Sequence, residues 1–175
     1  DGPTEESAKA LLETLTKRFP GVIADGHTGT SSLRVTLPRD ARGELLVEEP
    51  ASGVGAHVAL VGARRGERVD RGGLSVFPSS GVVMRESPEG VEDFVQLETE
   101  PSGGGVDYRL SLAEGTHLRL VSTSLELLDR SGTPRIRMTP PWLVDATGQR
   151  RDVRVSIEGC AYDASLAPPW GRPTT

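Results

Sequence analysis

The residues best suited to chemistry lie in a glycine-rich stretch near the N-terminus, D-G-H-T-G-T-S-S, which contains Asp25, His27 and Ser31. A histidine near a carboxylate and a hydroxyl has the components of a general base with a nucleophile, or of part of a metal site. No second histidine stands at metal-ligand spacing from His27, and no G-x-S-x-G string marks a serine nucleophile. A hydrolase with its site near Asp25 and His27 is therefore only a second alternative.

The two tryptophans are the candidate binding residues. Trp142 follows Pro140 and Pro141 at the start of an apolar run, and Trp170 lies in the string P-P-W-G. An exposed aromatic ring could stack on a sugar or contact a peptide. Core packing is the simpler interpretation of Trp142, and we expect Trp170 to anchor the C-terminal stretch together with Tyr162. A carbohydrate- or peptide-binding β-sandwich is the first alternative function.

The remaining motifs indicate structure rather than chemistry. Two acidic turns, D-R-S-G at 129–132 and D-A-T-G at 145–148, have the composition of hairpin turns, and no calcium loop of the D-x-D-x-D-G kind is present. The triple glycine at 103–105 is not followed by Gly-Lys-Ser/Thr. His57 and His117 fall within strand-like runs, and the arginine pairs at 64–65 and 150–151 read as hairpin tips. We predict no catalytic residue, no metal site and no cofactor.

Six short runs of alternating apolar and polar residues organise the chain from Val106 to Ile157, and turn-forming residues separate them. The runs lie at 106–112, 116–121, 124–128, 134–138, 141–144 and 152–157. This spacing is typical of an antiparallel meander. Similar runs occur in the first half, at 32–37, 45–49, 56–61, 74–77, 82–84 and 94–97. The fold class predicted is mainly β, an antiparallel β-sandwich or barrel-like meander of eleven or twelve strands.

One amphipathic helix is predicted over 4–19, because Ala8, Leu11, Leu15 and Phe19 form an apolar stripe that Pro20 and Gly21 end. We expect this helix to lie on a sheet face. The predicted organisation is a helix at 1–21, one all-β domain at 22–160 with a candidate sub-boundary at 101–105, and a proline-rich tail or linker at 161–175.

Composition narrows the class of partner. The net charge of −5 argues against a nucleic-acid partner, which would require a basic surface. No apolar run reaches the roughly 18 residues that a membrane span needs. Cys160 is the only cysteine, so it is either a small buried thiol or a half-cystine whose partner lies beyond Thr175.

The block from Asp107 to Trp170 resembles a segment of large secreted or surface-anchored bacterial proteins that carry β-propeller repeats of the FG-GAP kind. The residues that carry the resemblance are L-R-L-V-S-T-S-L-E-L-L-D-R-S-G-T-P-R-I-R-M-T-P-P-W-L-V-D-A-T-G-Q-R and I-E-G-C-A-Y-D-A-S-L-A-P-P-W-G-R-P. In such proteins a β-rich N-terminal domain precedes the repeats. No repeat array is present in these 175 residues.

The resemblance implies export to the cell surface and a structural or adhesive role. It also implies that Cys160 pairs with a cysteine downstream, and it transfers no catalytic residue. The start at Asp1 would suit a chain trimmed after a signal peptide or a lipid-anchor cysteine. The leading hypothesis is a non-enzymatic extracellular module of a larger bacterial surface protein. Its expected partners are other domains of the same polypeptide or components of the cell surface.

Overall fold

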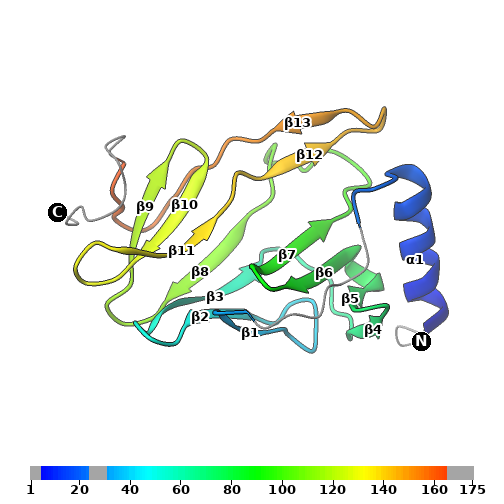
Figure 1. Ribbon diagram of the computed structural model, residues 1–175. Coiled ribbons are helices and arrows are strands. Elements are labelled where there is room, and N and C mark those ends of the chain that lie inside the picture. Colours follow the sequence, from blue (N-terminus) through cyan, green and yellow to red (C-terminus); the bar gives the residue numbers. More distant parts are fainter. Residues whose placement is uncertain (1–4, 24–30, 165–175) are drawn as a thin grey trace. The chain divides into compact units, whose positions relative to one another are not determined.

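The computed structural model describes residues 5–23 and 31–164, which form a mainly β structure with one α-helix (Figure 1). This confirms the fold class predicted from period-two hydrophobicity. In chain order the elements are α1 (Glu5–Arg18), β1 (Arg34–Thr36), β2 (Leu45–Glu49), β3 (Val54–Leu60), β4 (Val69–Arg71), β5 (Leu74–Phe77), the 3-10 turn η1 (Pro78–Ser80), β6 (Val82–Ser87), β7 (Gly90–Val95), β8 (Tyr108–Leu112), β9 (His117–Val121), β10 (Ser124–Leu128), β11 (Pro134–Met138), β12 (Trp142–Val144) and β13 (Arg150–Asp152).

The chain divides into two compact units. Unit 1 contains Asp1–Val47 and His57–Ser111, and unit 2 contains Glu48–Ala56 and Leu112–Thr175. The candidate sub-boundary at 101–105 falls inside unit 1. The strands β1, β2, β3 and β8 form one sheet in that order, and the boundaries of the units run through three of these strands.

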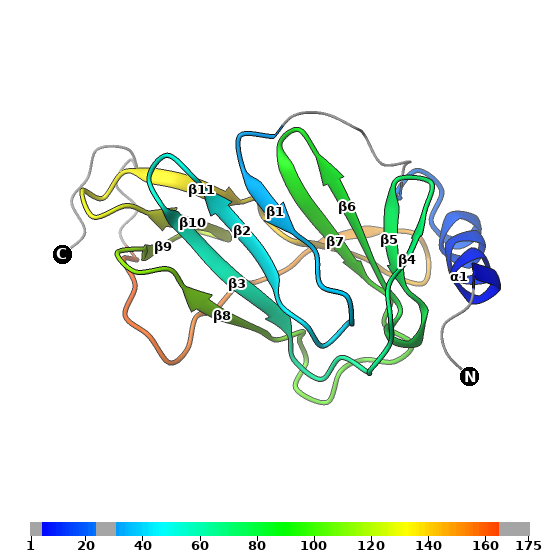
Figure 2. The same cartoon turned by 90° about the horizontal axis from the view of Figure 1, so that it is seen from below.

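Unit 1 contains a four-stranded antiparallel sheet in the order β4-β5-β6-β7, in which every strand pairs with its sequence neighbour (Figure 2). Strand β4 was not predicted, because V-D-R is too short and polar to show an alternating pattern. Residues 86–93, E-S-P-E-G-V-E-D, are rich in turn-forming types, but most of them belong to β6 and β7. Strands β6 and β7 pair as far as Ser87 opposite Gly90, which leaves only Pro88 and Glu89 between them.

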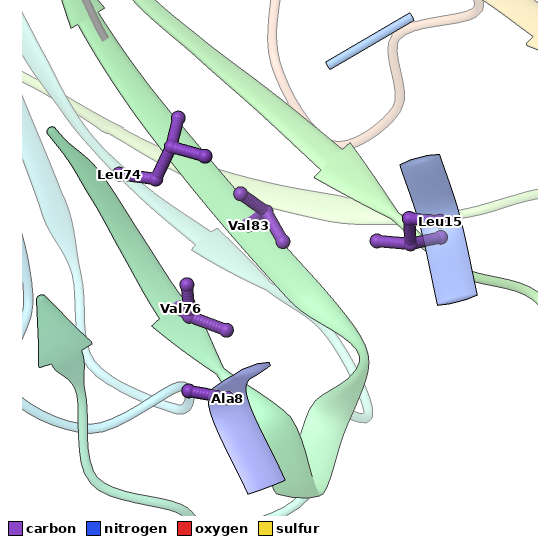
Figure 3. Packing of buried hydrophobic residues seen from close by; sticks show 5 residues of the cluster. All are labelled: Ala8, Leu15, Leu74, Val76 and Val83. Carbon is purple, nitrogen blue, oxygen red and sulfur yellow. The ribbon is translucent and has the colours of Figure 1, made fainter. Parts of the chain in front are cut away.

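Helix α1 lies on the face of this sheet, as the apolar stripe predicts. Ala8 and Leu15 pack against Leu74 and Val76 of β5 and Val83 of β6 (Figure 3). The buried residues of this interface are small or branched aliphatics, and the partly buried Phe19 and Phe94 pack against them. Thr4, whose hydroxyl is suited to cap the N-terminus of this helix, lies outside the described residues. Glu5 and Glu6 stand at the positive end of the helix dipole, and Lys17 and Arg18 stand at the negative end.

Unit 2 contains the antiparallel sheet β11-β10-β9 and the hairpin β12-β13. Its buried apolar residues include Leu118, Leu125, Leu127 and Leu128, the last with no exposed surface. The prediction of a strand over 152–157 was wrong. β13 covers Arg150–Asp152, and 153–158 is irregular although its burial still alternates. The two arginines of the expected hairpin tip, Arg150 and Arg151, lie in β13 itself.

No helix in the described ranges is long and apolar enough to cross a membrane.

Candidate functional site

The structure describes only some of the residues singled out in the sequence. Asp25, His27 and Trp170 lie outside the described residues. The hydroxyl oxygen of Ser31 accepts a hydrogen bond from the backbone N–H of Leu33 at 3.0 Å, so it serves a local turn. The hydrolase alternative therefore stays a prediction.

Trp142 lies at the start of β12 and is half-buried. The guanidinium of Arg150 lies over its ring, 4.7 Å from the centroid. The two residues form a diagonal pair on one face of the hairpin, in which Trp142 lies opposite Asp152 and Val144 lies opposite Arg150. A cation over an aromatic face is attracted to the ring and occupies that face. A sugar could stack on Trp142 only from the other side of the ring, or after Arg150 moves.

The most distinctive polar arrangement is a row of four charged side chains in unit 2. In spatial order it consists of Asp163, Arg119, Glu126 and Arg137, and we call it the charge row. The strand register places Arg119 opposite Glu126, and Glu126 opposite Arg137. Asp163 forms a parallel bridge with Arg119 at the other edge of β9. Residues directly opposite one another share a sheet face, so signs alternate along the row.

The inner part of the charge row is buried. The side chains of Arg119 and Glu126 are 0% and 2% exposed, whereas that of Arg137 is 49% exposed. Arg119 Nε donates to Asp163 Oδ2 at 3.2 Å. Arg137 Nε and Nη2 both donate to Glu126 Oε1, at 3.0 and 2.7 Å. Two guanidinium and two carboxylate groups give the row no net formal charge.

Glu126 Oε2 is less well satisfied. It accepts no hydrogen bond from the described residues, and Arg119 Nη1 lies 3.7 Å from it. A buried carboxylate oxygen needs compensation, and here the adjacent guanidinium supplies charge without a short hydrogen bond. Arginine does not release its proton in the physiological range. The contacts of the charge row are electrostatic cross-links between neighbouring strands and the segment that contains Asp163.

Two hairpin turns of unit 2 repeat one set of contacts. In the first, Asp129 Oδ1 accepts hydrogen bonds from the N–H and hydroxyl of Ser131 and from the N–H of Thr133. Asp129 Oδ2 accepts from Arg135 Nε at 2.8 Å. These contacts, above all the Ser131 hydroxyl, hold the pKa of Asp129 well below its ordinary value of 3.8.

The second turn has the same design, with D-x-[S/T]-G-x-x-R as the shared string. Asp145 Oδ1 accepts from the N–H and hydroxyl of Thr147 and from the N–H of Gln149, and Oδ2 accepts from Arg151 Nε at 2.8 Å. The Thr147 hydroxyl and then Arg151 lower the pKa of Asp145 strongly. The prediction that both acidic strings are hairpin turns is confirmed.

Unit 1 places a second polar pair beside a small cavity. The hydroxyl of Tyr108 donates to Asp93 Oδ2, and both residues line an otherwise apolar cavity of about 30 Å³. Asp93 is exposed as a residue, but desolvation at this contact raises the pKa of its carboxyl group. Desolvation also raises the pKa of Tyr108. Ligand cavities usually measure about 300–1,000 Å³, so this one has room for water only.

A second hollow in unit 1 is larger and open. It measures about 240 Å³ and is lined by Leu37, Arg68, Asp70, Gly73, Leu74, Ser75 and Glu86. Within it the Ser75 hydroxyl donates to Asp70 Oδ1 at 2.6 Å, and Arg68 Nε lies 3.1 Å from the same oxygen. We call this hollow the β5 cleft. It offers hydrogen-bond donors and acceptors but no aromatic platform.

The remaining candidate residues lie apart from these features. Cys160 is exposed and unpaired, so the interpretation as a buried thiol was wrong, and the proposed pairing beyond Thr175 stays a prediction. His57 and His117 lie on β3 and β9 with exposed side chains, as predicted. Among the described residues, no three His, Cys, Asp or Glu side chains gather closely enough to hold a metal ion.

The sequence gives little warning of the charge row. L-R-L and L-E-L alternate as half-buried strands do, which predicts that Arg119 and Glu126 face water. The opposite charges of Arg119 and Glu126 in neighbouring strand-like runs are the one indication of a pair. They predict a contact only when the register of the two strands is known. Nothing in the sequence predicts that Asp163 contacts Arg119, because Asp163 lies in a stretch expected to be a tail. Tyr162, the expected anchor of that stretch, is 40% exposed.

Comparison with known protein families, with curated proteins and with solved structures finds no match to this chain. The function must therefore be inferred from the residues and contacts described above.

Proposed function

We propose that this chain is a non-enzymatic, extracellular structural or adhesion module of a larger bacterial surface protein. The observation that carries the proposal is the charge row. Its ionisable side chains pair with one another across neighbouring strands, and none of them lines the small cavity or the β5 cleft. Within the charge row, Asp163 pairs with Arg119, which lies 44 residues away in the sequence. A surface module requires such cross-links between strands, because it must keep its fold while other domains and the cell surface exert force on it.

The two repeated turns support the same function. In each turn both carboxylate oxygens of the aspartate accept hydrogen bonds from the same hairpin. Asp129 and Asp145 therefore stabilise the connections between two strands. Their lowered pKa values keep both groups ionised in mildly acidic surroundings. The resemblance of 107–170 to surface-anchored bacterial proteins agrees with this assignment.

The proposal is tested by locating the module on cells. Antibodies raised against this domain are applied to intact and to permeabilised cells of the bacterium that produces it. We expect labelling of intact cells, and loss of that labelling after brief treatment of the cells with protease. Labelling that requires permeabilisation would refute a surface location. Turnover of generic ester, peptide or glycan substrates by the purified chain would refute the non-enzymatic assignment.

A carbohydrate- or peptide-binding module is the second candidate, and the β5 cleft is the observation that favours it. Its donors and acceptors suit a small polar ligand such as a sugar. A glycan and peptide panel read by calorimetry tests this candidate. A hit that Asp70→Ala abolishes, and that the exposed control Asp152→Ala leaves unchanged, would establish the cleft as a site. Acrylamide quenching of tryptophan fluorescence with and without the ligand reports whether Trp142 takes part.

A further inference from the structure

Two surface loops of unit 1 are joined to each other, residues 39–42 after β1 and residues 64–68 before β4 (Figure 2). Asp40 of the first forms an antiparallel bridge with Glu67 of the second. Two backbone hydrogen bonds of 2.9 Å also connect them, from Ala41 N–H to Gly66 O and from Arg68 N–H to Arg39 O. We call this pair of segments the basic loops, because their sequences are R-D-A-R and R-R-G-E-R.

The carboxylate of Asp40 connects the two loops and leaves their arginines largely exposed. Its Oδ1 accepts a hydrogen bond from Arg42 N–H at 2.9 Å, and its Oδ2 accepts one from Gly66 N–H at 3.1 Å. The Nε atoms of Arg42 and Arg65 lie 3.8 and 4.0 Å from these oxygens, and the two side chains are 58% and 82% exposed. Ion pairs as exposed as these contribute little free energy, so both guanidinium groups can bind another anion.

The basic loops are opposite in charge to the rest of the chain. Five arginines and two acids give their nine residues a net formal charge of +3, whereas the whole chain carries −5, so the remainder carries −8. Arg39 and Arg64 are exposed, and their side chains form no ion pair with any described residue. Arg68 pairs with Asp70, with Nε 3.1 Å from Oδ1. The loops therefore present four exposed guanidinium groups on a backbone that hydrogen bonds hold in place.

We propose that the basic loops bind an anionic polysaccharide, a sugar polymer that carries sulfate or phosphate groups. An arginine side chain donates two parallel hydrogen bonds to such an oxyanion, which a lysine side chain cannot do. Because the backbone contacts between the loops are already formed, binding has to order only the arginine side chains. This site is separate from the structural role proposed above, and binding by the purified chain can succeed or fail whatever the location of the protein.

The charge that surrounds the basic loops favours a flexible polymer over other polyanions. A DNA duplex is stiff over about 150 base pairs, and a membrane is an extended plane. Each would approach the rest of the chain, with its net charge of −8, as well as the loops. A flexible sugar chain can contact the loops alone. Neither loop contains an aromatic residue, so the bases of a single-stranded nucleic acid would have no platform on which to stack.

Binding is measured by the fluorescence anisotropy of labelled heparin, a sulfated polysaccharide, with labelled neutral dextran as the uncharged reference. The test variant is Arg64→Ser/Arg65→Ser, which keeps the backbone contacts of the loops. The control, Arg130→Ser/Arg154→Ser, removes the same charge from two exposed arginines of unit 2.

We expect the parent chain to bind heparin at about 50 mM salt and not to bind dextran. The test variant should bind heparin about thirtyfold more weakly, because one basic residue near an anionic surface contributes a factor of about five. The control should bind heparin as the parent does. Circular dichroism and the midpoint of thermal denaturation should agree among the three proteins, since all four substituted side chains are exposed.

The salt dependence of binding reports how many arginines take part. The logarithm of the affinity falls linearly with the logarithm of the salt concentration, with a slope set by the number of anionic groups that are neutralised. The slope should be smaller by roughly two in the test variant and unchanged in the control.

Four outcomes would overturn the proposal. A parent chain that does not bind heparin has no such site. Equal losses in the two double variants would show that overall charge, and not the basic loops, governs binding. Tighter binding to duplex DNA or to phosphatidylserine vesicles, lost in the test variant, would assign the loops to a nucleic acid or a membrane. Salt-sensitive self-association in sedimentation velocity, lost in the test variant, would assign them to the acidic surface of a second copy.

Discussion

Arg119 and Asp163 are 44 residues apart in the sequence, yet Nε of the arginine lies 3.2 Å from Oδ2 of the aspartate, and both side chains are nearly inaccessible to water. Removing two charges from water is unfavourable unless each compensates the other. Arg119 meets this condition by facing one carboxylate on each side. We therefore expect the stability of unit 2 to fall when a member of the charge row is removed.

Replacing Arg119 by methionine tests this dependence. The change keeps much of the side-chain volume but leaves Glu126 and Asp163 without their shared cation. We expect the free energy of unfolding to fall by about 3–5 kcal/mol, measured by urea denaturation. Arg130→Met is the matched control, because Arg130 pairs with Glu114 at 3.0 Å while both are largely exposed. That control should change stability by less than about 1 kcal/mol. Equal effects would show that burial of the row contributes nothing.

The repeated turns make a prediction about backbone conformation. Gly148 has a φ of 81°, which is left-handed, and a Cβ added there would meet no atom within 4 Å. Gly148→Ala should therefore cost about 1–2 kcal/mol through backbone strain alone. Gly103→Ala is the control, since its site is equally open and its φ is not left-handed. Thermal denaturation should show a lower midpoint for the first variant and no loss for the second.

Much of this fold could be predicted because its strands obey simple alternation. Strands β9, β10, β11 and β12 lie within one or two residues of the predicted runs, and the apolar stripe of α1 predicts both the helix and its position on a sheet face. The failures have physical reasons. Residues 153–157 alternate as a strand does, but β13 pairs with β12 through Arg150–Asp152, and alternation alone does not supply a partner for the residues beyond.

The charge row could not be predicted, because alternation assigns polar residues to the solvent side. Glu126 lies between Leu125 and Leu127, yet all three are buried. Sheet faces are covered by segments from elsewhere in the chain, and this covering is not encoded locally. The two acidic turns were predictable for the opposite reason, since all of their partners lie within six residues of the aspartate.

The turns should also contribute to the acid sensitivity of unit 2. Asp129 and Asp145 have lower pKa values when folded than their ordinary value of 3.8, so the unfolded chain binds protons more readily. The stabilisation is complete above that value and is lost as the pH falls below it. The double variant Asp129→Asn/Asp145→Asn should lose stability at neutral pH and show a flatter dependence below about pH 4. A curve parallel to that of the parent would contradict the assigned role.

Asp93 should act in the opposite direction. Desolvation raises its pKa in the folded state, so the folded protein binds protons more readily than the unfolded chain. Stability should therefore fall as the pH rises from 3.8 through the raised value. Asp93→Asn keeps an oxygen that can accept from Tyr108 and removes the titration. We expect the variant to equal or exceed the parent in stability at neutral pH, as urea denaturation at several pH values can measure. A clear loss would show that the carboxylate itself stabilises unit 1.

The attachment of α1 to its sheet depends on one buried cluster, to which the helix contributes Ala8 and Leu15. The side chain of Leu15 is 6% exposed and belongs to the cluster with Val76 and Val83, which have no exposed surface. Leu15→Ala removes buried methyl groups and leaves a cavity, so it should cost about 2–5 kcal/mol. Thr14→Ala, one position earlier, loses only the exposed hydroxyl bond to Ala10 O and should be nearly neutral. Because α1 packs on the face that contains β5 and β6, Leu15→Ala should also speed hydrogen exchange in those strands. A fall in helical circular dichroism with unchanged exchange in β5 and β6 would instead show that the sheet is stable without its helix.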